Sequence, residues 1–343
     1  MGVRRLLSQF AVICWVGLSI LLLSIPSFAE SASAAALYQE ALTAMKNKQP
    51  EAAVPLMKKS AKMGYPAAES AMGDYYYKGK YLKKDYQKAL KWYQKSVNKD
   101  DKYGQYGLAL MYYHGRGVKR NYKLSYKYTL MSAKQGLPIA IYNVGYMQYH
   151  GYGVKKNKPQ ALRWYKASGR KGYIDGMYNA GHMMLNGLGV KKNQTEGLMW
   201  MYQAARLKDK GALRILKRYS VRGSAPADFY LSLLYYKGKG VKKDVERSNE
   251  YLLRSANNGY AQAQYDLATA YLTGAGFIQN DKKAVSWLKK SAKNGYAKAQ
   301  YTLGKLYYRG HLVEKSSSKA EFWLEKSAAQ GNEKAKELLE SRR

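Results

Sequence analysis

The sequence predicts an all-α protein, a solenoid of about seven helix–loop–helix repeats of 36 residues with capping helices. Three observations predict it. A Gly-x-Gly-Val motif recurs with that period, a residue that can cap a helix follows each copy, and small and apolar residues recur at helical spacing. One hairpin cannot bury its own apolar face, so neighbouring copies must stack side by side.

The first 29 residues are predicted to be a secretory signal peptide. Two arginines precede an apolar run over residues 6–25, and small residues suit cleavage after Ala29. Cleavage would leave a periplasmic or secreted protein without a stable membrane span. The alternative is an uncleaved signal that anchors the chain in the inner membrane, because the apolar run approaches the length that spans a bilayer.

The repeat period is broken once, between Gly187 and Gly238, where the step is 51 residues instead of 36. The added residues would form an extra helix or a degenerate half-repeat, at a bend between two arrays, or they are a harmless insertion. The predicted order is a signal peptide (1–29), an N-terminal capping hairpin (30–63), repeats one to four (64–207), the insertion (208–222), repeats five to seven (223–330) and a C-terminal capping helix (331–343).

The residues at equivalent positions of the seven copies form a repeat column, and each such column has a physical role. Six residues after the first loop glycine stands a side chain whose oxygen can cap a helix N-terminus. In five copies the second helix stops at a glycine, which favours the left-handed C-cap conformation, whereas Asp100 and Lys208 predict less ideal turns. The predicted caps are Asp85, Asn121, Asn157, Asn193, Asp244, Asn280 and Ser316, and the glycine stops are Gly136, Gly172, Gly259, Gly295 and Gly331.

These columns resemble the Sel1-like repeat (SLR) family, relatives of the tetratricopeptide repeat with a longer loop between the two helices. The segments Ala-Gln-Tyr-Thr-Leu-Gly-Lys-Leu-Tyr-Tyr-Arg-Gly at 299–310 and Lys-Ala-Val-Ser-Trp-Leu-Lys-Lys-Ser-Ala at 283–292 carry the resemblance most clearly. It covers roughly residues 64–330. The resemblance implies a right-handed α-solenoid whose first helices line a concave face. It also implies a role in protein–protein contacts, including envelope assembly, signalling and host interaction.

The chain is strongly basic, with 59 Lys and Arg against 23 Asp and Glu and a formal net charge of +36. Such a field attracts anionic partners, and among these nucleic acid does not fit the export signal. Basic pairs follow the loop valine in copies one to five and would form a basic edge, unless they are only a solvated face. The residues of this edge are Lys83, Lys84, Lys119, Arg120, Lys155, Lys156, Lys191, Lys192, Lys242 and Lys243.

Tyrosine is abundant, at 35 residues, whereas phenylalanine is scarce, at 5. In the tetratricopeptide geometry two columns of the first helix would face the groove, where tyrosines hold a protein segment with little loss of side-chain freedom. The alternative is that the inner column packs between neighbouring first helices. The predicted concave binding residues are Tyr77, Tyr113, Tyr149, Tyr236, Tyr308, Tyr142 and Tyr146.

Nothing in the sequence predicts catalysis. The only cysteine, Cys14, lies in the predicted signal, so the mature chain would have no disulfide, cysteine-bound metal or thiol nucleophile. His114 and His150 share a column one repeat apart, about 8–10 Å, which is too far to bind one metal together. The Gly-x-Gly loops follow helices and not strands, which rules out a phosphate-binding reading. We predict no enzyme, no metal and no cofactor.

The sequence therefore predicts an extracytoplasmic scaffold or adaptor of a bacterial envelope. Its tyrosine-lined concave face would hold a protein segment, and its basic edges would steer a partner with an acidic surface. Two alternatives stay open. One is a periplasmic immunity protein that neutralises an acidic toxin, and the other is a binder of an anionic envelope polymer such as peptidoglycan or lipopolysaccharide.

Overall fold

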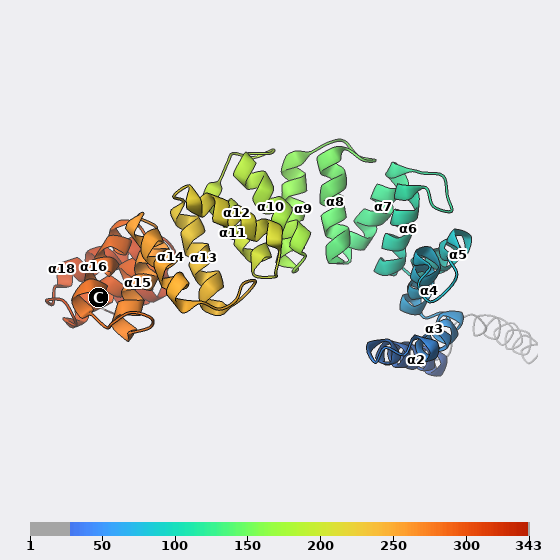
Figure 1. The fold of residues 1–343 in the computed structure, drawn as a ribbon, viewed down its shortest axis with the longest axis horizontal. Coiled ribbons are helices and arrows are strands. Elements are labelled where there is room, and N and C mark those ends of the chain that lie inside the picture. The colour runs from blue at the N-terminus through green and yellow to red at the C-terminus, as the bar shows by residue number, and fades with distance from the viewer. Residues whose placement is uncertain (1–27, 342–343) are drawn as a thin grey trace, which may run out of the picture. The chain divides into compact units, whose positions relative to one another are not determined.

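The structure is a computed structural model that describes residues 28–341. Over that range it contains 18 helices, α2 to α19, and no strand (Figure 1). The predicted all-α fold of paired helices is confirmed. The predicted signal peptide lies outside the described residues except for Phe28 and Ala29, which belong to α2. None of the helices described is both long enough and apolar enough to cross a membrane.

The chain divides into two compact units, and each is described by itself. Unit 1 ends at Ala161 and unit 2 begins at Leu162. In unit 1 the helices α2/α3, α4/α5 and α6/α7 pack as hairpins, and each hairpin packs on the next. Its helices are α2 (Phe28–Lys46), α3 (Pro50–Lys62), α4 (Pro66–Lys78), α5 (Tyr86–Val97), α6 (Lys102–His114), α7 (Tyr122–Lys134) and α8 (Pro138–His150), and α9 (Lys158–Arg170) spans the division.

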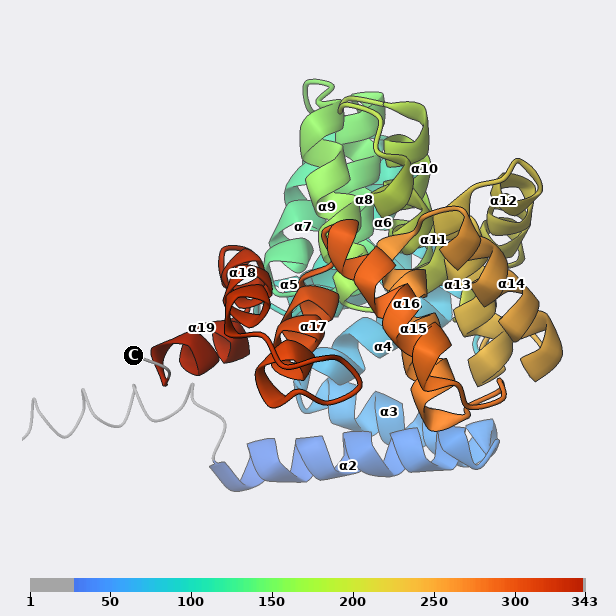
Figure 2. The ribbon, with the colours of Figure 1, turned by 90° about the vertical axis from the view of Figure 1, so that its left-hand side faces the viewer.

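Unit 2 repeats the same arrangement, with α10/α11, α13/α14, α15/α16 and α17/α18 as hairpins. Figure 2 shows α17, α18 and α19 following one another at its end. The helices are α10 (Ile174–Asn186), α11 (Gln194–Ala205), α12 (Lys210–Val221), α13 (Ala225–Lys237), α14 (Val245–Asn257), α15 (Ala261–Thr273), α16 (Asp281–Lys293), α17 (Ala297–Arg309), α18 (Ser317–Ala328) and α19 (Glu333–Glu340).

All seven predicted N-cap residues cap their helices. Each side-chain oxygen accepts a hydrogen bond from the backbone N–H three residues further on, at 2.8–3.4 Å. The five predicted glycine stops have φ between 82° and 88°. Asp100 and Lys208 adopt the same left-handed conformation without glycine, at φ 56° and 71°. The helix boundaries are thus fixed by local chemistry that recurs in each repeat.

A column of buried serines, which the sequence analysis did not single out, ties the two helices of a hairpin together. Near the end of the second helix, the serine hydroxyl donates to a carbonyl at or near the start of the first helix, at 2.6–2.8 Å. Such a bond satisfies a hydroxyl that burial would make costly. The donors are Ser60, Ser132, Ser255, Ser291 and Ser327.

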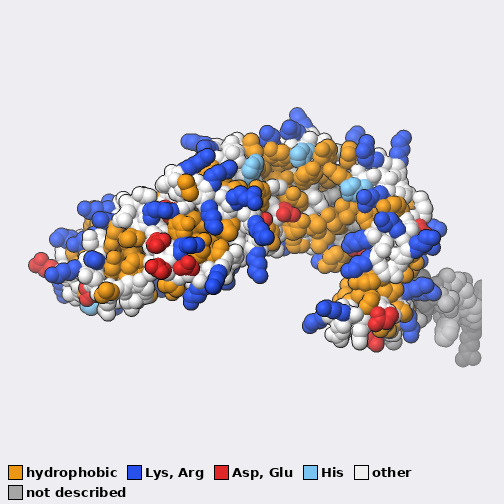
Figure 3. Space-filling model, viewed as in Figure 1, with side chains coloured by type: hydrophobic (Ala, Val, Ile, Leu, Met, Phe, Trp, Pro, Cys, Tyr) orange, Lys and Arg blue, Asp and Glu red, His pale blue; other side chains and the backbone are white. Residues whose placement is uncertain are grey.

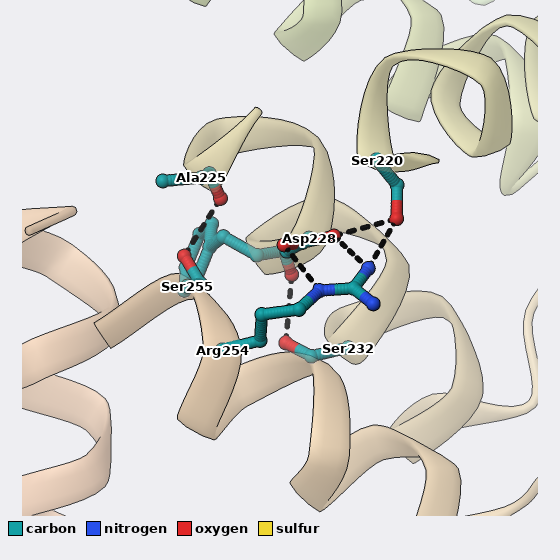
Figure 4. Close-up of polar contacts among 7 residues, drawn as sticks. Ser220, Ala225, Asp228, Ser232, Arg254 and Ser255 are labelled. Atoms are coloured by element: carbon teal, nitrogen blue, oxygen red, sulfur yellow. Dashed lines mark hydrogen bonds and ion pairs between the residues drawn. The ribbon is translucent and has the colours of Figure 1, made fainter. Parts of the chain in front are cut away.

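The extra helix α12 packs against both α11 and α13, while α11 also contacts α13 directly. A buried polar network joins it to the next repeat (Figure 4). The Asp228 carboxylate on α13 is fully buried and accepts from Ser220 of α12 at 2.6 Å. Arg254 of α14 donates to both Asp228 oxygens, through Nε at 2.7 Å and through a terminal nitrogen, and also to Ser220. That residues 208–222 form a bend stays a prediction.

Candidate protein-binding surface

A cluster of aromatic rings in unit 1 lies where repeat two meets repeat three. Tyr113 of α6, Tyr122 of α7 and Tyr152 of the loop after α8 meet with ring centroids 5.1–5.9 Å apart. All three rings are half-buried, so each keeps a solvent-facing part. We refer to this set and the rings described next as the aromatic junction, which consists of Tyr113, Tyr122, Tyr142, Tyr146, Tyr149, His150 and Tyr152.

Helix α8 supplies the rest of the junction. Tyr146 lies 4.4 Å from His150, 6.0 Å from Tyr152 and 6.5 Å from Tyr142, between ring centroids. Tyr142, Tyr146 and His150 recur at spacings of four along α8 and therefore share one helix face. Apolar side chains, a class in which tyrosines are counted, cover α8 on the side seen in Figure 3.

The Tyr113 hydroxyl of the junction is neutral at physiological pH. Tyr113 and Tyr146 form a hydrogen bond, and burial, followed by the nearby Tyr146, raises the pKa of Tyr113 to about 12. Desolvation, and after it the charge of Lys156, lowers the pKa of His150, which favours its neutral form. The surface therefore offers flat rings with hydrogen-bonding edges and no negative charge.

The loop backbone places Tyr152 against its neighbours. Gly153 has φ 69°, and a Cβ added there would lie 2.0 Å from the Tyr122 carbonyl oxygen. Only glycine allows the loop to approach the first turn of α7 this closely. The adjacent Tyr152 amide donates to the Met147 carbonyl at 2.9 Å, which fixes the turn that carries the ring.

Cationic side chains lie beside the rings. The Arg120 guanidinium carbon is 5.5 Å from the Tyr122 centroid, and Lys158 Nζ is 5.4 Å from the Tyr149 centroid. Both distances suit cation–π contact. All ten residues of the predicted basic edge are exposed, and none of them forms an ion pair within the described part of the chain. Six belong to unit 1 and four to unit 2.

The tyrosines that the sequence predicted to bind a partner have different surroundings in the structure. Tyr113, Tyr142, Tyr146 and Tyr149 come together in the aromatic junction. In unit 2, Tyr236 and Tyr308 are 51% and 39% exposed. That these six bind a partner stays a prediction.

Tyr77 differs from the others, because it is only 8% exposed. Its hydroxyl accepts a hydrogen bond from Arg116 at 3.0 Å, and the guanidinium carbon lies 5.3 Å from its ring centroid. Packing occupies Tyr77, so it presents little surface to a partner.

Sequence reasoning missed Tyr122, His150 and Tyr152. Tyr152 is the middle residue of a Gly-x-Gly loop, where other copies carry Arg116, Leu188 or Lys239. An aromatic residue at that variable position was the available signal. No group of three or more potential metal-ligating side chains occurs among residues 28–341. The arrangement is suited to holding a partner by contact area, hydrogen bonds and charge.

A tandem array of helical hairpins with long inner loops defines a repeat protein of the tetratricopeptide-like class. Seven copies of the Sel1 repeat match the chain, and it therefore belongs to the Sel1 repeat family. Proteins of this family are scaffolds for protein–protein interaction and are generally not enzymes. The copies span residues 66–101, 102–137, 138–173, 174–209, 225–260, 261–296 and 297–332.

Several solved structures are similar to this chain. A protective antigen of uropathogenic Escherichia coli with an SLR fold is 28% identical, with a TM-score of 0.48, over 90% of this chain and 64% of that one. This chain thus spans less than two thirds of that protein. A Sel1 repeat protein from Oxalobacter formigenes is 27% identical (TM-score 0.39; 90% and 87% covered). An immunity protein from Pseudomonas aeruginosa is 22% identical (TM-score 0.29; 65% and 81% covered). A search of curated proteins returned no match.

Proposed function

We propose that this protein is an extracytoplasmic scaffold that holds a segment of a partner protein on the aromatic junction of unit 1. The observation that carries the proposal is the cluster of half-buried tyrosine rings on α6, α7, α8 and the following loop, with the exposed ring of His150 beside them. Tyrosine and histidine rings give a partner large contact area with few rotatable bonds to immobilise. Their polar edges pair with the backbone of a bound segment.

The exposed positive charges beside the aromatic junction favour a partner that carries acidic groups. Lys119, Arg120, Lys155 and Lys156 stand exposed in the loops that border the junction and have no acidic partner there. Unpaired cations beside an apolar surface accelerate association with an acidic segment and fix its orientation. Most of the binding free energy would come from contacts with the rings, because exposed ion pairs contribute only about 0–1 kcal/mol each.

The test is affinity purification of the tagged protein from envelope extracts of its native host, with quantitative mass spectrometry. Tyr149→Ala should lower recovery of the partner about tenfold, and the pair Lys155→Glu and Lys156→Glu should lower it and flatten its dependence on salt. The matched control is Lys191→Glu with Lys192→Glu, which occupies the same repeat columns beside Leu188 instead of Tyr152. The control should retain the partner.

Two results would contradict the proposal. Equal loss in the control pair would mean that bulk charge, and not the aromatic junction, holds the partner. Unchanged recovery after Tyr149→Ala, with the thermal midpoint preserved, would remove the rings from the binding surface. Sedimentation with isolated cell wall at physiological salt separates the anionic-polymer alternative, because that binding would need no partner protein.

A further inference from the structure

A groove of about 290 Å³ opens in unit 2 between α13, α14 and α15, where repeat five meets repeat six. It exists because the side chains at three repeat positions of α15 and the loop after it are small. Thr269, Thr273 and Ala275 occupy the repeat positions that Tyr146, His150 and Tyr152 fill in repeat three. Without those rings, the space over α15 stays open to solvent. Figure 3 shows acidic side chains among basic ones over α13 to α15.

The four serine and threonine hydroxyls that line the groove have used their donors elsewhere. Ser232 and Ser248 donate to backbone carbonyls at 2.7 and 2.9 Å, and Thr269 and Thr273 do so at 3.1 and 3.0 Å. Asn249 donates to the Gly276 carbonyl at 2.6 Å. A hydroxyl that donates to a carbonyl can offer a ligand only its lone pairs. The lining therefore presents more acceptors than donors, which suits a ligand rich in N–H donors.

Asp266 adds the charge. Asp266 is one of the residues that line the groove, and its carboxylate accepts no hydrogen bond within the described residues. Burial raises the pKa of Asp266 to about 6, although Lys298 and Lys237 oppose that rise, so the group is ionised at pH 7.4. A half-buried carboxylate without a donor is costly, and a bound cation would relieve that cost.

An aromatic wall completes the groove. Tyr236 of α13 lines it and is 51% exposed. A guanidinium stacks on such a ring and carries five N–H donors in one plane. An ammonium group has three donors and no plane to stack. The lining thus favours the guanidinium shape among cations.

We propose that this groove binds the arginine side chain of a partner protein, with the guanidinium against Asp266 and Tyr236. This site is separate from the aromatic junction and has the opposite charge preference. Charge complementarity selects the occupant, because a local carboxylate and a set of acceptors stand out in a chain of net charge +36. The surrounding positive field opposes a cation without such a site and so disfavours unspecific binding of arginine.

The experiment is calorimetric titration of the full protein with acetyl-Gly-Arg-Gly-amide and with the same peptide carrying citrulline, its neutral isostere. The arginine peptide should bind at least tenfold more tightly, and Asp266→Asn should abolish that preference. Thr269→Tyr, which places in repeat six the side chain that repeat three carries, should block both peptides while Asp266 stays in place. Circular dichroism checks that each variant keeps its helices.

Tyr152→Ala is the matched control in the aromatic junction and should bind the arginine peptide as the unaltered protein does. A loss there would overturn the assignment to unit 2. Equal binding of arginine and citrulline peptides, or no binding of either by the unaltered protein, would also overturn it. None of these outcomes bears on recovery of a partner by the aromatic junction, so the two proposals fail separately.

Discussion

The junction of repeats two and three in unit 1 and the junction of repeats five and six in unit 2 use the same repeat positions to opposite effect. In unit 1, Tyr146 and Tyr152 close the junction with rings. In unit 2, Thr269 and Ala275 leave a groove lined by acceptors and one carboxylate. The backbone is the same helical hairpin in both. Side-chain size at a few solvent-facing positions therefore decides what kind of surface a repeat offers.

Two further equivalent positions, one in each unit, carry buried carboxylates that differ in their hydrogen-bond partners. Glu69 in unit 1 and Asp228 in unit 2 occupy one repeat column, at 2% and 0% exposure. Lys99 donates to one oxygen of Glu69 at 2.6 Å, and the other oxygen has no partner among the described residues. Arg254 donates a hydrogen bond to each of the two carboxylate oxygens of Asp228. The network in unit 2 is thus the more complete.

The largest expected effect tests this second comparison. Arg254→Ala should lower the free energy of unfolding by about 3–4 kcal/mol, because it removes two hydrogen bonds from the fully buried Asp228 carboxylate and one from Ser220. Lys99→Ala should cost about 2 kcal/mol, since it removes one hydrogen bond from Glu69. Urea denaturation followed by circular dichroism measures both. Equal losses would show that completeness of the network does not matter.

The loop that carries Tyr152 should tolerate replacement of its glycine by alanine less well than an open turn does. Gly153→Ala should destabilise by about 2–3 kcal/mol, because its Cβ would meet the Tyr122 carbonyl in a left-handed backbone conformation. Gly172 has a similar φ of 88° with nothing within 4 Å, so Gly172→Ala should cost about 1 kcal/mol. Thermal denaturation compares the two variants. A smaller loss at Gly153 would mean that the loop moves aside.

Asp266 should make the open junction sensitive to pH. Its folded pKa of about 6 exceeds the unfolded value, so its contribution favours folding below about pH 4 and is lost as pH rises through 6. The charges and hydroxyls that act with it are Lys237, Lys298, Tyr260 and Tyr296. Asp266→Asn should therefore stabilise by about 2 kcal/mol at pH 8 and very little at pH 4. A pH-independent gain would contradict this reasoning.

The smallest effect distinguishes the two turns that lack glycine. Lys208→Gly should stabilise by about 0.5–1 kcal/mol, because its backbone is left-handed at φ 71°. Asp100 has φ 56°, but its carboxylate accepts from Gln105 at 2.6 Å, a bond that Asp100→Gly would lose. That variant should gain nothing or lose about 0.5–1 kcal/mol. Both changes are read from urea midpoints.

Much of the frame was predictable because it depends on local chemistry. The caps, the glycine stops and the pairing of helices follow from residues that act within a few positions of themselves. The tyrosines were less predictable. Tyr77 and Tyr113 share a column, yet Arg116 covers one, whereas Tyr152 leaves part of the other exposed. The neighbour that decides this comes from the next repeat, and no rule within one repeat specifies it.

The sequence by itself determined the period, the helix ends, the family and the excess of positive charge, since each is written in residue types at fixed spacing. Only the tertiary structure decided which rings meet, that Asp228 is paired across three helices, and that the space beside Asp266 is open. The physical reason is that burial depends on the volumes of side chains brought together from different repeats. Those volumes vary from copy to copy, while the frame that carries them stays the same.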